Sequence, residues 1–279
     1  MSVEEIRVRD EPVGDGQHLL ISTHAWWSGS YSFLSEGREG VPRLRYMCLV
    51  EHRRDLWIPA DPADDWLLDR RRTGRRIWLL GSEKQARADG IDLDNSHNAY
   101  LTDGRRRAAY GDFYPRAGSP PQPRQGRWTQ PDRDFLAALP RDAGEMLRRL
   151  ERDSRNRSPS APFRYAVDLL RSGLAPAEIR AVVYRALRGL DGIEPLRRTT
   201  DVDGRTCLAL PHQTARERHE LLIDPNTGLY AGERTTVIDD SGSVPAGTVT
   251  STTSALIGVV DRLGDIPEEM NAQRRDGTP

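Results

Sequence analysis

Cysteine is scarce in this sequence, with only Cys48 and Cys207 among 279 residues. The two lie far apart, each in an apolar stretch typical of a strand. Because cysteine packs readily as a small hydrophobic residue, we expect two buried free thiols rather than a disulfide. No CxxC pair occurs, so the sequence gives no support for a structural zinc site, and we expect no metal and no cofactor.

Long apolar runs and an excess of charge are missing too. No stretch approaches the roughly eighteen apolar residues that a membrane span needs, and the N-terminus shows no signal-peptide pattern. As written, the chain is expected to be soluble and cytoplasmic. Its 41 basic and 42 acidic residues give a formal net charge of −1. This balance argues against a nucleic-acid partner or an anionic membrane surface.

Short catalytic motifs are missing as well. The sequence contains no HExxH, no GxSxG, no Walker A loop and no Rossmann glycine fingerprint. No two histidines stand four residues apart on a helix, and His24, beside Trp26 and Trp27, is predicted to be a packed or edge residue of a strand rather than a ligand or base. The arginine runs at 70–76 and 105–107 flank predicted turns, which indicates solvated strand edges. The sequence therefore predicts no catalytic residue.

The segments that are present follow a clear order. Residues 17–110 are rich in Leu, Ile, Val and aromatic residues between turn formers, as in strands. A Pro-rich connector at 114–127 precedes three segments, within about 130–190, whose apolar residues recur at helical spacing. Strand-like alternation returns from 192 to 260. Strands segregated from helices are typical of an α+β fold with an antiparallel sheet.

Turn residues divide the strand segments into hairpins. Gly74 can adopt the positive φ of a tight turn, so residues 66–81 are predicted to form a hairpin. The stretch 220–237 carries Asp-Pro-Asn-Thr-Gly between two apolar arms, in which Asp224 can accept backbone N–H bonds and Gly228 can be left-handed. Turn geometry accounts for this whole motif, and we expect a corner of the chain rather than a catalytic acid.

Aromatic residues are the best candidates for a binding site. Trp57, Trp66 and Trp78 fall within 22 residues, on strands that are expected to be neighbours. In a curved sheet their rings would line a concave apolar surface, to which Tyr184 of the third predicted helix would add. The alternative is ordinary core packing of these rings against the helices.

Six segments stand in a specific order between residues 17 and 264: LWIPADPADDWLLDRRRTG, FLAALPRDAGEMLRRLERDS, LLRSGLAPAEIRAVVYRALRGLDGIE, DVDGRTCLAL, LLIDPNTGLYAGERTTV and PAGTVTSTTSALIGVVDRLG. Together they resemble the extracytoplasmic domain of an uncharacterised family of actinobacterial membrane-anchored proteins. Members of that family are often associated with extracytoplasmic-function sigma factors. The resemblance implies an extracytoplasmic location, although the family's membrane span is missing from this chain.

The DGR…DPxTG pair of hairpins is also similar, more distantly, to the lipoprotein-carrier and periplasmic sigma-regulator fold. That fold implies a strongly curved antiparallel β-sheet, a half-open barrel, with a helical block packed on its concave side. The family has no established catalytic residues, so none is carried over to this sequence.

We therefore expect a flexible N-terminal arm over residues 1–13, a single α+β half-barrel domain over 14–264 and a polar tail over 265–279. The expected function is a non-enzymatic binding or sensing domain that holds an apolar small molecule or lipid between sheet and helices. Arginines at the rim would be available for a headgroup. The alternative is a protein-interaction module that regulates a sigma or anti-sigma partner without a small ligand.

Overall fold

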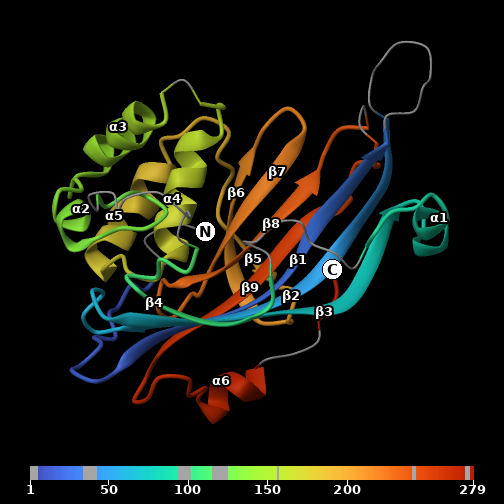
Figure 1. Cartoon of the computed structure of the whole chain (residues 1–279). Coiled ribbons are helices and arrows are strands. Elements are labelled where there is room, and N and C mark those ends of the chain that lie inside the picture. Colours follow the sequence, from blue (N-terminus) through green and yellow to red (C-terminus); the bar gives the residue numbers. More distant parts are fainter. Residues whose placement is uncertain are drawn as a thin grey trace.

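The computed structural model describes residues 6–33, 43–93, 102–114, 125–155, 157–240, 243–273 and 277–279. These residues form an α+β fold with a nine-stranded antiparallel sheet and six helices (Figure 1). The strands are β1 (His18–Phe33), β2 (Arg43–Pro59), β3 (Asp65–Leu80), β4 (Gly104–Ala109), β5 (Arg197–Thr200), β6 (Thr206–Gln213), β7 (Glu217–Ile223), β8 (Tyr230–Val237) and β9 (Val249–Val260). The helices are α1 (Glu83–Ala88), α2 (Arg133–Ala137), α3 (Ala143–Asp153), α4 (Ala161–Arg171), α5 (Ala177–Leu187) and α6 (Glu268–Gln273).

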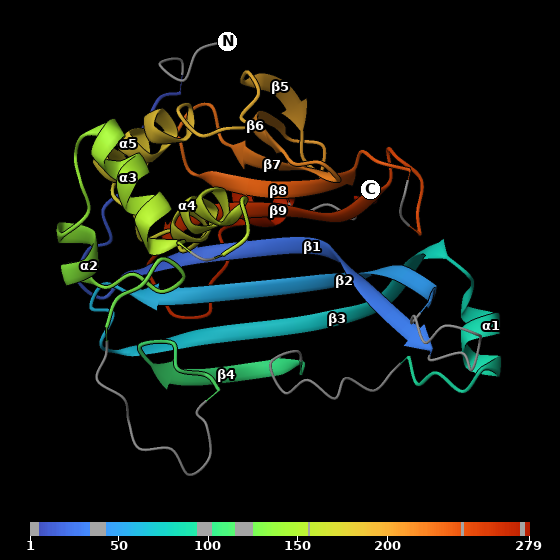
Figure 2. The same ribbon diagram turned by 90° about the horizontal axis from the view of Figure 1, so that it is seen from above.

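The sheet is built from two meanders joined at its centre. The strand order is β4-β3-β2-β1-β9-β8-β7-β6-β5, so the early strands make one half and the late strands the other (Figure 2). The halves meet where β1 pairs with β9, from His18 opposite Val260 to Trp27 opposite Ser251. Among the described residues β4 and β5 are the two edges, and the sheet is not closed into a barrel.

Helices α2–α5 gather on one face of the sheet, whereas α6 lies on the other (Figures 1 and 2). Alternation along β1 creates these two faces, because neighbouring side chains of a strand point to opposite sides. Leu19 and Ile21 point toward the helices, on what we call the helical face. Leu20 packs with Met270 of α6 on what we call the α6 face. The largest core cluster joins α3, α4 and α5 to the strands of the second half.

Capping residues mark one end of each of two longer helices, α3 and α4. The Asp142 side chain caps α3 by accepting a hydrogen bond from the Glu145 backbone N–H at 2.9 Å. Met146 and Leu150 of this helix are fully buried. Helix α4 is followed by Gly173 at φ +69°, the left-handed residue that commonly ends a helix.

The prediction of a hairpin within residues 66–81 was wrong. These residues belong to one continuous strand, β3, which pairs with β2 along its length. Gly74 has the expected positive φ of +84°, but it lies where the pairing register shifts between Val50 and His52. A glycine with positive φ occurs at an irregularity inside a strand as well as in a turn, and the local sequence does not distinguish the two cases.

The corner predicted at Asp224 is confirmed. Its Oδ1 accepts hydrogen bonds from the backbone N–H groups of Asn226, at 2.7 Å, and Thr227, at 3.2 Å. Gly228 follows with φ +63°, and the chain returns from β7 into β8. Most of the Pro-rich connector, residues 115–124, lies outside the described residues.

Both cysteines are buried free thiols, as expected. Residues 6–13 of the expected arm pack on the fold, with Ile6 in the main core cluster. The expected polar tail contains α6, whose Met270 packs on the α6 face. In the described parts of the chain, no helix has both the length and the apolar character to cross a membrane.

Candidate functional site

Two of the proposed ligand-lining residues lie deep in separate parts of the core. Trp57 is 1% exposed on the α6 face, and its Nε1 donates a hydrogen bond to the Asp265 carbonyl at 2.7 Å. Tyr184 of α5 is fully buried in the main core cluster, and its hydroxyl donates a hydrogen bond to the Gly228 carbonyl at 2.8 Å. The structure does not bring these two side chains together.

The other two proposed residues are also separate from each other. Trp78 is half-buried at the far end of β3, with its ring edge-to-face with Tyr46 at a centroid distance of 6.4 Å. Trp66 lies on the helical face, packs with Leu56 and Leu68, and lines a cavity. The role of all four residues in ligand binding stays a prediction, and Trp66 is the one that the structure places at a cavity wall among the described residues.

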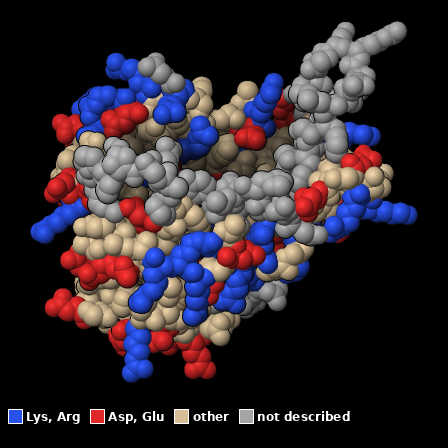
Figure 3. All heavy atoms as spheres, in the orientation of Figure 1, with Lys and Arg blue, Asp and Glu red and all other residues tan. Residues whose placement is uncertain are grey.

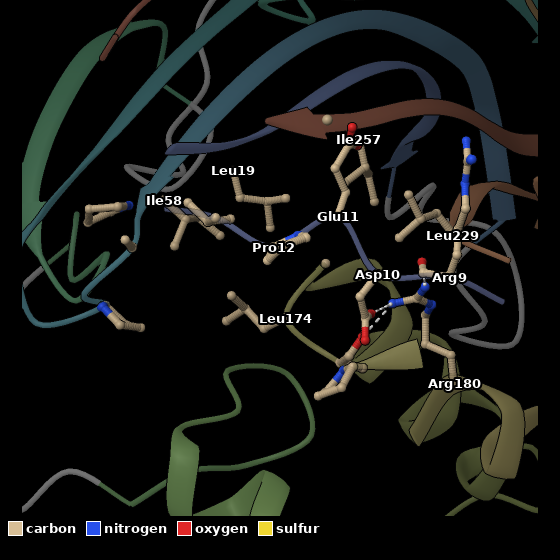
Figure 4. Close-up of a pocket in the computed structure, with 18 residues that line it drawn as sticks. Arg9, Asp10, Glu11, Pro12, Leu19, Ile58, Leu174, Arg180, Leu229 and Ile257 are labelled. Atoms are coloured by element: carbon tan, nitrogen blue, oxygen red, sulfur yellow. Dashed lines mark hydrogen bonds and ion pairs between the residues drawn. The ribbon is translucent and has the colours of Figure 1, made fainter. Parts of the chain in front are cut away.

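One cavity has a volume of about 320 Å³ and is partly walled by the N-terminal segment, so we call it the arm cavity (Figure 4). Leu19 and Ile58 come from the helical face of the sheet, and Leu174 faces them from the connection between α4 and α5. Pro12 of the N-terminal segment and Ile257 of β9 complete an apolar lining.

Arg180 fixes the N-terminal segment that walls this cavity. Its guanidinium is 3% exposed and donates to the Arg9 carbonyl at 2.6 Å and to Asp10 Oδ1 at 3.2 Å. It also donates to the carbonyls of Ala175, at 2.8 Å, and Gly228, at 3.1 Å. The donors of this buried arginine are therefore used by the fold, which gives Arg180 a structural role.

The second cavity has a volume of about 370 Å³, and we call it the arginine cavity. Leu56 and Trp66 of the helical face form its floor, and Leu174, which also lines the arm cavity, forms part of its wall. Its other lining residues are Arg54, Gly111, Phe113, Tyr114, Arg127, Thr129, Gln130, Pro131, Asp168, Arg171 and Ser172. The two cavities are neighbours because they share Leu174 and because Ile58 and Leu56 stand two residues apart on one face of β2.

Strand pairing sets the chemistry of the arginine cavity. Across β1, β2 and β3, one row of the helical face consists of Ile21, Leu56 and Leu68. In the next row Arg54 lies directly opposite Arg70. The floor thus changes from apolar to basic between one row of side chains and the next. Like charges placed directly opposite each other on neighbouring strands are destabilising.

Arg54 lacks a counter-charge in this environment. Burial, together with the neighbouring Arg70, lowers the pKa of Arg54 to about 10. The Arg70 guanidinium lies 5.6 Å from the ring centre of Trp27. Among the residues that the structure describes, no hydrogen bond or ion pair reaches the Arg54 guanidinium.

The carboxylates nearest to this cavity are already engaged. Arg171 at the end of α4 bonds to Asp168 Oδ1 and to Glu233 Oε1, both at 2.7 Å. Glu233 also accepts a hydrogen bond from the Tyr230 hydroxyl at 2.5 Å. Both acids therefore contact Arg171, and within the described residues neither forms an ion pair with Arg54.

His24 is the strongest catalytic candidate on the α6 face. Its Nδ1 lies 2.6 Å from Asp203 Oδ1 and its Nε2 lies 2.9 Å from Glu51 Oε1. Burial opposes ionisation of Asp203, but hydrogen bonds from His24 and Ser254 keep its pKa below the usual value. His24 is 3% exposed and both ring nitrogens are occupied, so neither is available to a substrate. This geometry makes it a packed structural histidine, as predicted.

Arg54 was not among the predicted site residues, and the prediction that Arg70 lies at a solvated edge was wrong. Arg70 is 7% exposed and lies on the helical face. The sequence carries a signal for both, because residues two apart on a strand point to the same face. Arg54 stands two residues from Leu56, and Arg70 stands two residues from Leu68. Each arginine therefore belongs to an apolar face.

The surface seen in the direction of Figure 1 is hollowed between the helical group and the strands (Figure 3). Within the described ranges, no group of three or more His, Cys, Asp or Glu side chains could hold a metal ion. No protein-family model, no curated protein and no solved structure matches the chain. Its function has to be argued from the two cavities and the residues around them.

Proposed function

We propose that the protein is a non-enzymatic binding or sensing domain for an apolar, lipid-like ligand. The ligand lies between the helical face of the sheet and the connection from α4 to α5. The observation that carries this proposal is the pair of adjacent cavities that share Leu174 above one apolar floor.

The dimensions and lining of the cavities support this role. Volumes of about 320 and 370 Å³ fall within the range of small-molecule pockets, and the two together suit an elongated ligand. Leu19, Ile58, Leu56 and Trp66 offer a continuous apolar surface, and a few polar groups at one end would fix the orientation of a ligand.

The proposal extends to the finer architecture. The sheet would form a half-open barrel whose concave side holds the helical block, as in the lipoprotein-carrier and sigma-regulator fold that the sequence resembles. Support comes from the helices themselves, since α2–α5 all lie on one face of an unclosed sheet (Figure 1). A ligand site between sheet and helices is the natural position for such a fold.

The test is ligand capture by the full chain, measured by native mass spectrometry with dodecanol as the probe. Leu174→Trp adds bulk at the residue that lines both cavities and is expected to reduce dodecanol uptake about tenfold or more. The matched control is Leu190→Trp, because Leu190 is also a partly buried leucine but lines neither cavity. This control should take up dodecanol like the wild type.

Two results would count against the proposal. One is a wild-type chain that takes up no dodecanol. The other is equal uptake by the Leu174→Trp and Leu190→Trp variants. Either result would favour the alternative expectation, a protein-interaction module without a small ligand.

A further inference from the structure

We infer that Arg54 forms an anion-binding subsite, which takes the carboxylate or phosphate group of an amphiphile whose chain lies on the apolar floor. This inference rests on the proposed function and adds the chemical class of the ligand. The shared chemistry is a compact oxyanion attached to an unbranched apolar chain.

The charges around Arg54 favour a bound anion. A partly buried guanidinium that directly faces a second arginine is unfavourable unless an anion compensates it. Asp168, which lines the same cavity, and Glu233 are bound to Arg171. Among the described residues the protein supplies no ion-pair partner to Arg54, so a ligand anion would compensate its charge.

Arg54 lies at one end of the apolar floor. Its neighbour on the same face of β2 is Leu56, followed by Ile58, and both line the adjacent cavities. A ligand with its apolar chain over Ile58 and Leu56 would present its other end to Arg54. A guanidinium can donate two parallel hydrogen bonds to a carboxylate or phosphate, which suits this end of the site.

Another arginine, without an acidic partner among the described residues, lines the same cavity. Arg127 also lines the arginine cavity, and its Nη2 donates to Gln130 Oε1 at 3.2 Å. No acid is in contact with Arg127 in the described part of the chain. A second cation at the same cavity favours an anionic over a neutral or cationic headgroup.

The test compares three probes of equal chain length by isothermal titration calorimetry on the full chain. These are dodecanoate, dodecyl phosphate and dodecanol. We expect the wild type to bind the two anions about tenfold more tightly than the alcohol, since hydrogen bonds to charged groups are the strong ones. A preference between the two anions tells which oxyanion the subsite favours, and either preference supports the inference.

Arg54→Gln is the decisive variant. It should lose about tenfold in affinity for the anions and less than about twofold for dodecanol. Arg71→Gln is the matched control, because Arg71 is adjacent to Arg70 on β3 but points to the other face and is 62% exposed. This control should keep the preference of the wild type for anions.

The outcomes separate the subsite from the proposed function. Equal wild-type affinity for dodecanoate and dodecanol, or an unchanged preference in Arg54→Gln, overturns the subsite and leaves the apolar site standing. Inorganic phosphate that binds only when Arg54 is present, together with no binding of dodecanol, supports the subsite and rejects the proposed function.

Thermal unfolding provides a second test, which does not depend on Arg54→Gln folding well. Removal of one of two opposed arginines should raise the Tm of ligand-free Arg54→Met by about 2–4 °C, because a like-charge pair is relieved. Dodecanoate should raise the Tm of the wild type and not that of the variant. A shift with dodecanoate that persists in Arg54→Met overturns the inference.

Discussion

His52 shows at the scale of a residue what a basic, buried environment does to a titratable group. It stacks on Trp27 with a centroid distance of 4.8 Å and faces Arg72 across the strand pair. Burial, followed by the charges of Arg70 and Arg72, lowers the pKa of His52 from 6.5 to about 4. The folded protein therefore keeps His52 neutral at pH values where the unfolded chain binds a proton.

This shift predicts a loss of stability in mild acid. As the pH falls from about 6.5 to 4, the unfolded state binds more protons than the folded state, so the His52 contribution to the free energy of unfolding drops by up to about 3 kcal/mol. Urea unfolding of the wild type and of His52→Gln between pH 7 and pH 4.5 measures this loss of unfolding free energy. The wild type should lose more stability over this interval, whereas parallel curves would contradict the prediction.

Arg180 and Arg54 illustrate how one type of side chain can have different roles. Arg180 is buried and its donors are satisfied by backbone carbonyls and Asp10, so it holds the fold together. Arg54 has neither kind of partner among the described residues and lines a cavity. A polar group left unsatisfied in a folded protein is a cost to stability, and such costs gather at functional sites.

At the scale of elements, the turn between β7 and β8 holds the N-terminal segment and α5 in place. A Cβ on Gly228 would lie 2.4 Å from Val8 Cγ1, in addition to the strain of φ +63°. Gly204, in the turn between β5 and β6, has φ +82° and open space around the same position. The two glycines thus differ in their contacts and not in the sign of φ.

Replacement of both glycines by alanine separates these contributions. Gly204→Ala should cost about 1 kcal/mol, from backbone strain alone. Gly228→Ala should cost at least about 1 kcal/mol more, because the N-terminal segment must move away. Urea midpoints of the two variants give the comparison, and equal losses would show that the N-terminal segment adapts freely.

Sequence periodicity predicted the order of strands and helices better than it predicted which side chains face each other in the fold. The order of strands, helices and strands follows from local alternation and was found, and the Asp224 corner follows from its own residues. The opposition of Arg54 and Arg70 depends on the register between β2 and β3, and the shared role of Leu174 depends on where α4 ends above the sheet. Neither has a local signature, which is why aromatic residues, and not these side chains, stood out as the candidate site.

At the scale of the whole molecule, the two meanders should unfold together. Their junction, β1 with β9, lies in the middle of the sheet, and Ala255 of β9 belongs to the core shared with the helices. A charge at this position would disturb both halves, because it would be buried without a partner.

Two optical probes test this cooperativity. Five of the six tryptophans precede residue 79, so fluorescence reports mainly on the first half, while the helical signal of far-UV circular dichroism comes mainly from α3–α5. The two thermal transitions should coincide, and Ala255→Asp should lower both by the same amount. Separate midpoints would show that each meander is an independent unit.

The pairing of β1 with β9 also has a consequence for synthesis. Of the strands of this sheet, β1 is synthesised first; β2 follows within a few seconds and covers one side of it, but the other side waits for β9, the last strand. Until then β1 would present an open row of backbone donors and acceptors, which is a template for wrong pairing with other nascent chains. The time needed to translate residues 60–248 therefore sets how long this edge stays open.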